Sequence, residues 1–405
     1  MGGFPTRIGY EEALAIVQRV STARALDGDR MAIKRADSRI LMQDVVAGID
    51  LPPFDNSRMD GFALRHADLA ADDQTPLRIV GDQFAGVALG IRLNPGECVR
   101  ITTGAPMPQG ADTVVIKENV VVQDDVVSVP AGVRIGAHVG RAGEDVGIGE
   151  LVLQRGSVLS PARASLLAAL GVAEVEVAKR PTVAVFTTGD ELVEPGLPLL
   201  PGQIYNSNRE LMMGLLRAEG LEPVAWPTLP DDPARMEVML RDAASAFDVV
   251  LTCGGVSAGE KDLVPGFLES QGEVHFWKVR MKPGMPVIFG GLDKALFVGL
   301  PGNPVAVLAT FLALVRPLLD GLQGRVETRP RRFARLSTAW EKSHERFEFL
   351  RGSLQYRPDG VVQVSPNPAD ASHRLRAASE SDSLILLGEG ARAYAKGDVV
   401  EVLAY

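Results

Sequence analysis

The sequence of 405 residues has little cysteine, few aromatic residues and no long run of basic residues. Its two cysteines, Cys98 and Cys253, are too few for a disulfide framework, and its five histidines are too scattered for a zinc cluster. The formal net charge of -9 argues against nucleic acid as the main partner. Any site for an anion must therefore be local.

Long apolar runs are also missing. No stretch approaches the roughly 18 apolar residues that span a bilayer, and the N-terminal residues lack the charged and apolar regions of a signal peptide. We therefore expect a protein without membrane association, in a reducing cytoplasmic compartment.

Glycine and proline are abundant, with 42 and 27 residues, which predicts many turns and short strands. Near-helical spacing of apolar residues predicts a helix over residues 10–26. Short β-type runs between residues 39 and 153 predict one or two β-rich domains. After a linker at 324–332, short strands return, so we expect a small C-terminal β-barrel or sandwich.

Between these regions, strands alternate with helices. The expected strands are 182–187, 223–228, 248–252, 273–279, 286–289 and 295–298, and the expected helices are 207–219, 233–246 and 304–319. This order predicts a multidomain α/β protein whose central domain holds a parallel sheet covered by helices. Ser207 and Glu210 have the spacing of a capping box, and Asp232 precedes a proline at a first helical position.

Four loops that follow these strands carry the candidate chemistry, because ligands of parallel sheets gather beyond the carboxyl ends of the strands. The segments are Thr188–Glu191, which includes Asp190, then Asp231, then Cys253–Asp262 with Gly254, Gly255 and Ser257, and finally Leu300–Pro304. Glycines allow backbone amides to approach a phosphate, and the helix start after Asn303 also favours an anion. Taken singly, a glycine-rich turn is more often a tight connection and an acidic loop residue is more often only solvated.

The four loops together combine anion sites with carboxylates, and these would repel an anionic ligand unless a cation lay between them. Mg²⁺ is usually held by one or two carboxylates and a substrate phosphate. The sequence therefore predicts metal-assisted chemistry on a phosphoanhydride.

Residues 275–283 (HFWKVRMKP) add a row of cations. Strand alternation would place Lys278, Arg280 and Lys282 on one face. Two interpretations stay open, an edge strand protected by its charges or an electropositive wall beside an anionic site. In the N-terminal half, residues 51–65 and 140–149 have the composition of turns.

Eight motifs, in order, resemble those of the MoeA and gephyrin E-domain family. They are LPPFDNSRMDGFALR (51–65), RITTGAPMPQGADTVV (100–115), GEDV (143–146), TTGDEL (187–192), YNSNREL (205–211), GGVSAGEKD (254–262), MKPGMP (281–286) and GLPGNP (299–304). They extend over most of the chain, and so many ordered motifs are highly specific. One departure is Asn206, which stands where the family often has Asp.

The resemblance implies a homodimer of four domains in each subunit. These are an elongated N-terminal domain at 1–50 and 142–178, an inserted β-rich domain at 51–141, a molybdopterin-binding α/β domain at 179–325, and a C-terminal β-barrel at 330–405. It also implies Mg²⁺-dependent insertion of molybdate into adenylylated molybdopterin, with release of AMP. Expected protein partners are a second copy of the chain, the adenylyltransferase of the preceding step, and enzymes that receive the cofactor.

The resemblance also assigns roles by motif position. Catalytic roles would fall to Asp60, Asp145, Glu191, Asp231 and Asp262, and metal ligands would be Asp190, Glu191, Asp231 and Asp262. Substrate would contact Thr103, Gly254, Gly255, Ser257, Lys278, Lys282, Pro301, Pro304 and Arg351. The β-rich domain of the partner subunit would supply Asp60, Thr103 and Asp145. Two alternatives are an adenylyltransferase that consumes ATP without molybdate, and a non-catalytic scaffold of the same fold.

Overall fold

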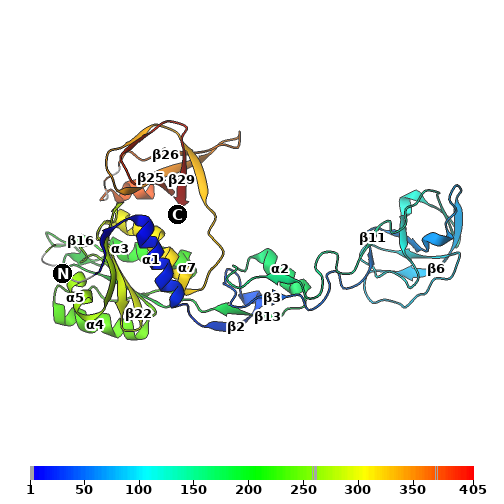
Figure 1. Cartoon of the computed structure of the whole chain (residues 1–405), viewed down its shortest axis with the longest axis horizontal. Helices are drawn as coiled ribbons and strands as arrows, with labels where there is room; N and C mark the ends of the chain where they lie inside the picture. Colours follow the sequence, from blue (N-terminus) through cyan, green and yellow to red (C-terminus); the bar gives the residue numbers. More distant parts are fainter. Residues whose placement is uncertain (1–3, 258, 260–261, 370, 372) are drawn as a thin grey trace. The chain divides into compact units, whose positions relative to one another are not determined.

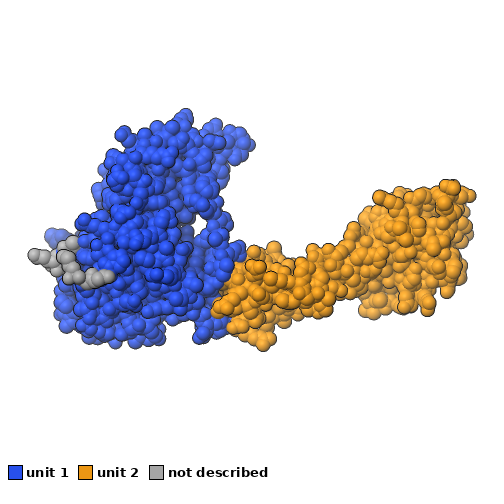
Figure 2. Space-filling view, in the orientation of Figure 1, with its two compact units in different colours: residues 1–29, 177–405 blue, residues 30–176 orange. Residues whose placement is uncertain are grey.

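The computed structural model describes residues 4–257, 259, 262–369, 371 and 373–405. The chain divides into two units, and each is described by itself. Unit 1 combines residues 1–29 with 177–405, and unit 2 comprises residues 30–176 (Figure 2).

Unit 1 is built on a seven-stranded sheet. In sheet order its strands are β1 (Thr6–Ile8), β19 (Glu273–Val279), β21 (Ile288–Leu292), β22 (Ala295–Leu300), β18 (Val249–Cys253), β14 (Val183–Thr187) and β17 (Val224–Ala225). Strands β22, β18, β14 and β17 are parallel as predicted, whereas β21 runs antiparallel to both of its neighbours. The sheet is therefore mixed, because only two residues, Asp293 and Lys294, join β21 to β22, and so short a connection joins antiparallel strands.

Helices cover both faces of this sheet (Figure 1). One face carries α1 (Tyr10–Ala23), α3 (Ser207–Ala218), α6 (Pro304–Thr310) and α7 (Arg316–Leu322), and the other carries α4 (Pro233–Ala246) and α5 (Leu263–Gln271). Side chains of β14 point alternately to the two faces of the sheet. Val183 and Val185 pack with the first set of helices, and Ala184 and Phe186 pack with the second set. Helix α1 therefore belongs to unit 1, although the sequence groups residues 1–50 with the N-terminal domain.

Residues Pro304–Leu322 form one continuous helix of 19 residues, with a π-helical turn at Phe311–Val315. With 19 residues and a mean hydropathy of 1.8, the helix is long and apolar enough to cross a membrane. The expectation that no segment approaches that length is therefore wrong. Within this fold 83% of the most apolar 18-residue window of the helix is buried. A helix that is apolar on all sides is typical of a protein core, and this one lies between the sheet and its covering elements.

The C-terminal part of unit 1 is a closed five-stranded barrel, as predicted. In order its strands are β25 (Phe347–Tyr356), β26 (Val362–Pro366), β23 (Arg332–Leu336), β29 (Val399–Ala404) and β27 (Ser383–Leu387), and β27 pairs with β25 to close the ring. A further short strand, β20 (Met281–Lys282), comes from the α/β region and pairs with β25. The segment that leaves β19 therefore joins the sheet of the α/β domain to the barrel.

Unit 2 contains a six-stranded sheet, as the β-type runs predict. Its order is β8 (Thr113–Ile116), β5 (Gly61–Leu64), β7 (Glu97–Ile101), β6 (Thr75–Gln83), β10 (Val126–Val129) and β9 (Val121–Gln123). A separate small core forms around Ala47, Val146 and Leu170, at the end of helix α2 (Pro161–Ala169). Asp60 lies just before β5 and Thr103 lies just after β7, on neighbouring strands.

Candidate functional site

A cavity of about 420 Å³ lies at the carboxyl ends of β14, β18 and β22 in unit 1. Its walls include the loops after these three strands and the first residues of α3 and α6. The residues are Thr188, Gly189, Glu191, Leu192, Ile204–Asn208, Asp231, Cys253–Ser257, Asp262, Pro286 and Pro301–Pro304. The structure thus brings together Glu191, Asp231, Asp262, Gly254, Gly255, Ser257, Pro301 and Pro304, which the sequence predicts as site residues. We call this space the glycine-loop cavity.

Two glycines allow the loop after β18 to pack closely against the loop after β14. Gly254 has φ 96° and Gly255 has φ 68°, a region that side chains rarely adopt. A Cβ atom on Gly254 would lie 2.4 Å from Thr188 Oγ1. The amide of Gly254 donates to Leu300 O at 2.9 Å, so the loops after β18 and β22 are also joined. The glycine pattern therefore has a structural role as well as a possible role in approaching an anion.

In the part of the chain that the structure describes, three carboxylates line the cavity, those of Glu191, Asp231 and Asp262, and Asp190 does not line it. Asp262 begins α5, and its Oδ2 atom accepts a hydrogen bond from the Gly259 amide at 2.7 Å. Among the described residues, no three His, Cys, Asp or Glu side chains converge as a metal cluster. The protein would therefore offer a Mg²⁺ ion one or two carboxylates and leave the other positions to substrate and water, which is the usual donor set for this ion. Glu260 and Lys261, within the same motif, lie outside the described residues.

The first turn of α3 explains the departure at Asn206. Its Oδ1 atom accepts a hydrogen bond from the Arg209 amide at 3.3 Å, and its Nδ2 donates to Thr187 Oγ1 at 2.9 Å. Asn206 is therefore the N-cap, and the predicted capping box at Ser207 is wrong by one residue. Asn caps helices about as well as Asp, so this substitution preserves the start of α3.

Sequence reasoning missed Asn208, whose side chain also ties the cavity together. Its Nδ2 atom donates to Gly302 O at 2.6 Å and so joins the start of α3 to the loop after β22. Tyr205 and Cys253 line the cavity as well, and sequence reasoning gave them no role. The signal for Tyr205 and Asn208 was their position inside the motif YNSNREL, and the signal for Cys253 was its place at the start of the candidate loop Cys253–Asp262.

The three cations of residues 275–283 do not share a face. A register irregularity between Val274 and Phe276 and a φ of 68° at Lys278 interrupt the alternation. Lys278 Nζ lies 3.9 Å from the centre of the Trp277 ring, Arg280 pairs with Glu389 at 3.0 Å, and Lys282 pairs with Glu348 at 3.0 Å. The interpretation as an edge strand is also wrong, because β1 pairs with β19 on its outer side.

One residue of this segment supports the cavity indirectly. Trp277 Nε1 donates to Val256 O at 3.0 Å, so this hydrogen bond helps to fix the position of the glycine loop. Lys278 and Lys282 themselves are not among the residues that line the cavity. Arg351, in β25, is also elsewhere: it is 2% exposed and donates to Ala369 O and, at 3.2 Å, to Ala371 O. Ser372, next to this segment, lies outside the described residues.

In unit 2 the structure brings Asp60 and Thr103 together. Asp60 Oδ1 accepts hydrogen bonds from the Thr103 amide and hydroxyl, both at 2.9 Å, and Lys117 lies 3.5 Å from Oδ2. These donors, the amide first, hold the pKa of Asp60 below its usual range, so the carboxyl is ionised at neutral pH. The side chain is 46% exposed, and its contact with Thr103 reaches across 43 residues of sequence.

Asp145 is exposed in a turn of unit 2 that other residues hold. Arg141 pairs with Asp55 and Glu144 pairs with Arg58, both at 2.6 Å. The two segments predicted as turns, 51–65 and 140–149, are thus joined to each other. Local sequence gave no sign of this pairing, because the partners are 86 residues apart.

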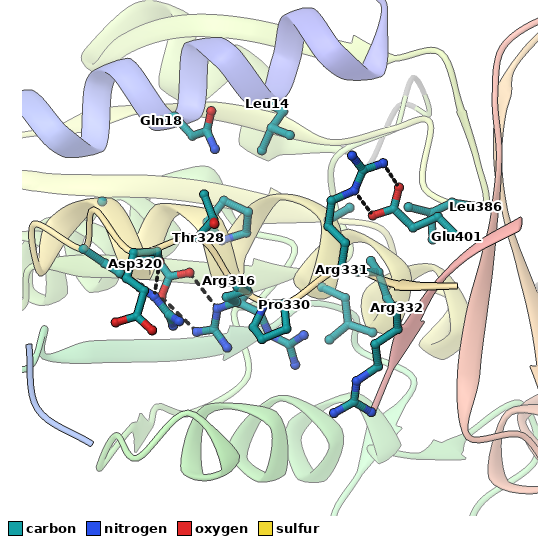
Figure 3. Close-up of a pocket in the computed structure, with 18 of the residues that line it drawn as sticks. Leu14, Gln18, Arg316, Asp320, Thr328, Pro330, Arg331, Arg332, Leu386 and Glu401 are labelled. Carbon is teal, nitrogen blue, oxygen red and sulfur yellow. Dashed lines mark hydrogen bonds and ion pairs between the residues drawn. The ribbon is translucent and has the colours of Figure 1, made fainter. Parts of the chain in front are cut away.

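A larger cavity, of about 740 Å³, lies elsewhere in unit 1, between α1, α7, β29 and the linker at 325–332 (Figure 3). We call it the linker cavity. Three of the arginines that line it are bonded to carboxylates: Arg331 bonds Glu401, Arg329 bonds both Asp320 and Glu219, and Arg316 bonds Glu219. Figure 3 shows the Arg331–Glu401 pair facing the Asp320 group across the linker. Size alone therefore does not identify the candidate site.

Matches to known protein families extend over most of both units. Residues 8–171 match the family described as "MoeA N-terminal region (domain I and II)", residues 184–321 match "Probable molybdopterin binding domain", and residues 334–405 match "MoeA C-terminal region (domain IV)". The glycine-loop cavity lies in the second of these regions.

Relatives and solved structures agree with these matches. The chain is 38% identical to the molybdopterin molybdenumtransferase of Haemophilus influenzae, over 91% of this chain and 92% of the relative. It is also 38% identical to molybdopterin molybdenumtransferase 2 of Mycobacterium tuberculosis, over 92% of both. A crystal structure of the molybdopterin biosynthesis protein MoeA from Pyrococcus horikoshii OT3 aligns with a TM-score of 0.84 at 28% identity, over 98% of this chain and 100% of that one. The chain therefore belongs to the MoeA family of molybdopterin molybdenumtransferases, which are transferases of molybdenum cofactor biosynthesis.

Proposed function

We propose that this protein inserts molybdenum into adenylylated molybdopterin, with molybdate as the second substrate. In this reaction water cleaves the phosphoanhydride into AMP and the terminal phosphate of molybdopterin, and the dithiolene sulfurs replace oxygen ligands of molybdate, which leave as water with the thiol protons. One observation carries the proposal: the glycine-loop cavity combines close-packed backbone loops, two helix starts and three carboxylates in the region that matches a molybdopterin-binding domain. Backbone amides and helix N-termini favour a phosphate, and carboxylates favour a divalent cation.

The proposal assigns the cavity residues as follows. The loop at Gly254, Gly255 and Ser257 receives the phosphoanhydride, and Pro301 and Pro304 shape the opposite wall. One or two of the carboxylates of Glu191, Asp231 and Asp262 would hold Mg²⁺, with Asp190 on the same turn as a further candidate ligand. Such an ion, when bound, neutralises phosphate charge and stabilises the leaving AMP. The protein's own carboxylates orient the attacking water and accept its proton.

Residues outside the cavity would act on the other substrate and from the second subunit. Lys278, Lys282 and Arg351 would balance the charge of molybdate and of the pterin phosphate. We further propose a cytoplasmic homodimer in which Asp60, Thr103 and Asp145 of one subunit complete the site of the other. The lowered pKa of Asp60 supports this role, because an accessible carboxylate that is ionised at neutral pH can serve a cationic or hydrogen-bonding partner. Transfer of substrate from the adenylyltransferase and of product to recipient enzymes belongs to the same proposal.

The direct test is AMP release. The purified protein is incubated with adenylylated molybdopterin, Mg²⁺ and molybdate, and AMP is measured by chromatography. We expect release that requires molybdate and is suppressed by EDTA. Absence of AMP release would contradict the proposal, and consumption of ATP and free molybdopterin without molybdate would favour the adenylyltransferase instead.

A mixed-subunit experiment tests the shared site. The Asp60→Asn and Asp262→Asn variants are each expected to be inactive, and they are co-expressed with different affinity tags. If each site uses Asp60 from one subunit and Asp262 from the other, a heterodimer keeps one intact site, and the random mixture recovers about a quarter of wild-type activity. If both residues act within one chain, every site carries one substitution and no activity returns. An Asp82→Asn variant, altered at another carboxylate of unit 2, serves as the matched control and should stay active alone.

A further inference from the structure

Glu348 of the barrel is a buried carboxylate in contact with a lysine from the α/β region. Its side chain is 3% exposed, and its Oε1 atom lies 3.0 Å from Lys282 Nζ. Acidic side chains are almost never fully buried unless they are paired. Lys282 therefore provides the charged partner that the buried carboxylate of Glu348 needs.

The backbone holds the two residues in register as well. Strand β20 pairs in parallel with β25, with Met281 opposite Phe347 and Lys282 opposite Glu348. The Phe347 amide donates to Arg280 O at 2.9 Å, and the Phe347 ring lies 4.6 Å from that of Tyr10 in α1. The position of Lys282 is thus set by the barrel, although the lysine belongs to the α/β region.

The surroundings of Glu348 are basic. His344 Nε2 lies 3.3 Å from the same Oε1 atom, and the ammonium of Lys342, which is 2% exposed, donates to His344 O and Gly390 O. Burial lowers the pKa of Lys342, and the charge of Glu348 opposes that shift. Glu348 is the largest of three carboxylate influences on Lys342, the others being Glu345 and Glu389, in a space with little water where charges interact more strongly than at the surface.

The burial of the second carboxylate oxygen of Glu348 lowers the stability of the fold. Its Oε2 atom is buried and has no hydrogen-bond partner among the described residues. A buried polar atom without a partner costs about 1–3 kcal/mol, and such atoms often mark functional positions. A glutamine or an apolar residue would avoid the cost of a buried charge, so the carboxylate is not explained by stability alone.

The other end of the segment leads directly to the glycine-loop cavity. Gly284, two residues after Lys282, has a φ of 108°. A Cβ atom on Gly284 would lie 2.6 Å from Thr310 Oγ1 in α6. Pro286, two residues later, lines the cavity. Only three residues thus separate the lysine held by the barrel from the cavity wall, and a shift of Lys282 would be transmitted along a tightly packed turn.

We propose that Glu348 is a positioning residue: its ion pair holds the Lys282 ammonium in place for the oxyanion substrate, so this carboxylate of the barrel controls the affinity for molybdate. This inference rests on the proposed function, in which Lys282 serves molybdate. Glu348 itself does not touch the substrate. Its effect should therefore be seen in the affinity for molybdate and should vanish when Lys282 is absent.

The experiment is a double-mutant cycle with Glu348→Gln, Lys282→Ala and the combined variant. KM for molybdate and kcat are measured from AMP release, molybdate binding is measured by calorimetry with Mg²⁺ and AMP present, and thermal unfolding is recorded. We expect Glu348→Gln to raise KM and the dissociation constant about tenfold with kcat nearly unchanged, and to have no further effect in the Lys282→Ala background. Glu389→Gln, which removes the neighbouring exposed partner of Arg280, is the control and should change neither constant.

Two outcomes would overturn the inference. One is an unchanged molybdate affinity in Glu348→Gln, and the other is an equal loss with and without Lys282, which would make Glu348 merely structural. If Glu348→Gln does not fold, Glu348→Asp keeps the buried charge but shortens its reach toward Lys282, and it should still weaken molybdate binding. A wild-type protein that binds molybdate with this dependence but releases no AMP would contradict the proposed function and leave the inference standing.

Discussion

The two cavities of unit 1 differ in what forms their walls. In the glycine-loop cavity the walls are mainly turns at strand ends, and at Gly254 the packing leaves no room for a side chain. In the larger linker cavity the walls are long side chains, and arginines are bonded to Asp320, Glu219 and Glu401. An arginine whose guanidinium is bonded to two carboxylate oxygens, such as Arg329 or Arg331, contributes mainly to stability. A close-packed glycine loop instead holds amides where a ligand can reach them.

This difference predicts that substitutions in the first cavity change activity and substitutions in the second change stability. The largest effect is expected at Asp262. Asp262→Asn keeps an oxygen that can accept from Gly259 but removes the charge, so we expect turnover to fall about 1,000-fold. AMP release measures the loss, and urea unfolding should detect little change. Asp242→Asn, at an exposed position of α4, is the matched control and should keep full activity.

The next effect concerns Gly254. Gly254→Ala forces a side chain into a left-handed backbone conformation and against Thr188 Oγ1, so we expect a loss of about 3 kcal/mol in the free energy of unfolding, together with lower turnover. Gly324, beside the linker cavity, also has a positive φ of 64°, but a Cβ atom there would meet no other atom within 4 Å. Gly324→Ala should therefore cost only about 1 kcal/mol and leave turnover unchanged. Equal costs for the two alanines would contradict the account of the glycine loop.

A third prediction addresses the linker cavity. Glu219 is mostly buried and accepts from Arg316 at 2.7 Å and from Arg329 at 2.6 Å. Glu219→Gln should lower the free energy of unfolding by about 1–3 kcal/mol, because two charge-assisted hydrogen bonds lose their acceptor charge. Glu237→Gln removes an exposed helix pair with Arg241 and should have less than about 0.5 kcal/mol of effect. A fall in turnover without a fall in stability for Glu219→Gln would show that the linker cavity has a catalytic role.

The smallest effect is expected in unit 2. Thr103→Val removes the hydroxyl donor to Asp60 but keeps the amide donor, which is the larger cause of the lowered pKa. The pKa of Asp60 should rise and still remain below its usual value, as read from the pH titration of its carboxyl carbon by NMR. Because the folded pKa is lowered, any stability from this contact is present at neutral pH and is lost as the pH falls through the folded value. An unchanged titration in Thr103→Val would mean that the hydroxyl does not donate to Asp60 in solution.

The features that sequence predicted correctly are local ones. The loops after β14, β18 and β22 were found because the carboxyl ends of parallel strands meet at one edge of a sheet, and Asp232 was found because an N-cap and its proline are adjacent in sequence. The error at Ser207 is also local, because the N-cap is the preceding residue, Asn206. Asn and Ser are both good capping residues, and only the fold decides between them.

The features that sequence could not predict depend on pairing across the chain. Strand β1 pairs with β19 across about 270 residues, so β19 is an internal strand and the interpretation of residues 275–283 as an edge strand is wrong. Asp60 meets Thr103, and Lys282 meets Glu348, with no local signal in either segment. The prediction that three cations share one face of the strand is wrong because Lys278 takes a left-handed conformation and breaks the period of two. Such contacts follow from tertiary packing and not from any short pattern.

Hydrogen exchange compares the two cavities most directly. The protein is incubated with AMP, molybdate and Mg²⁺, and amide exchange is followed by mass spectrometry for peptides that cover residues 254–257 and residues 325–332. If the glycine-loop cavity holds the phosphate of the ligand, exchange should slow at residues 254–257 and stay unchanged in the linker. Slower exchange confined to residues 325–332 would contradict the account and would place the ligand in the linker cavity.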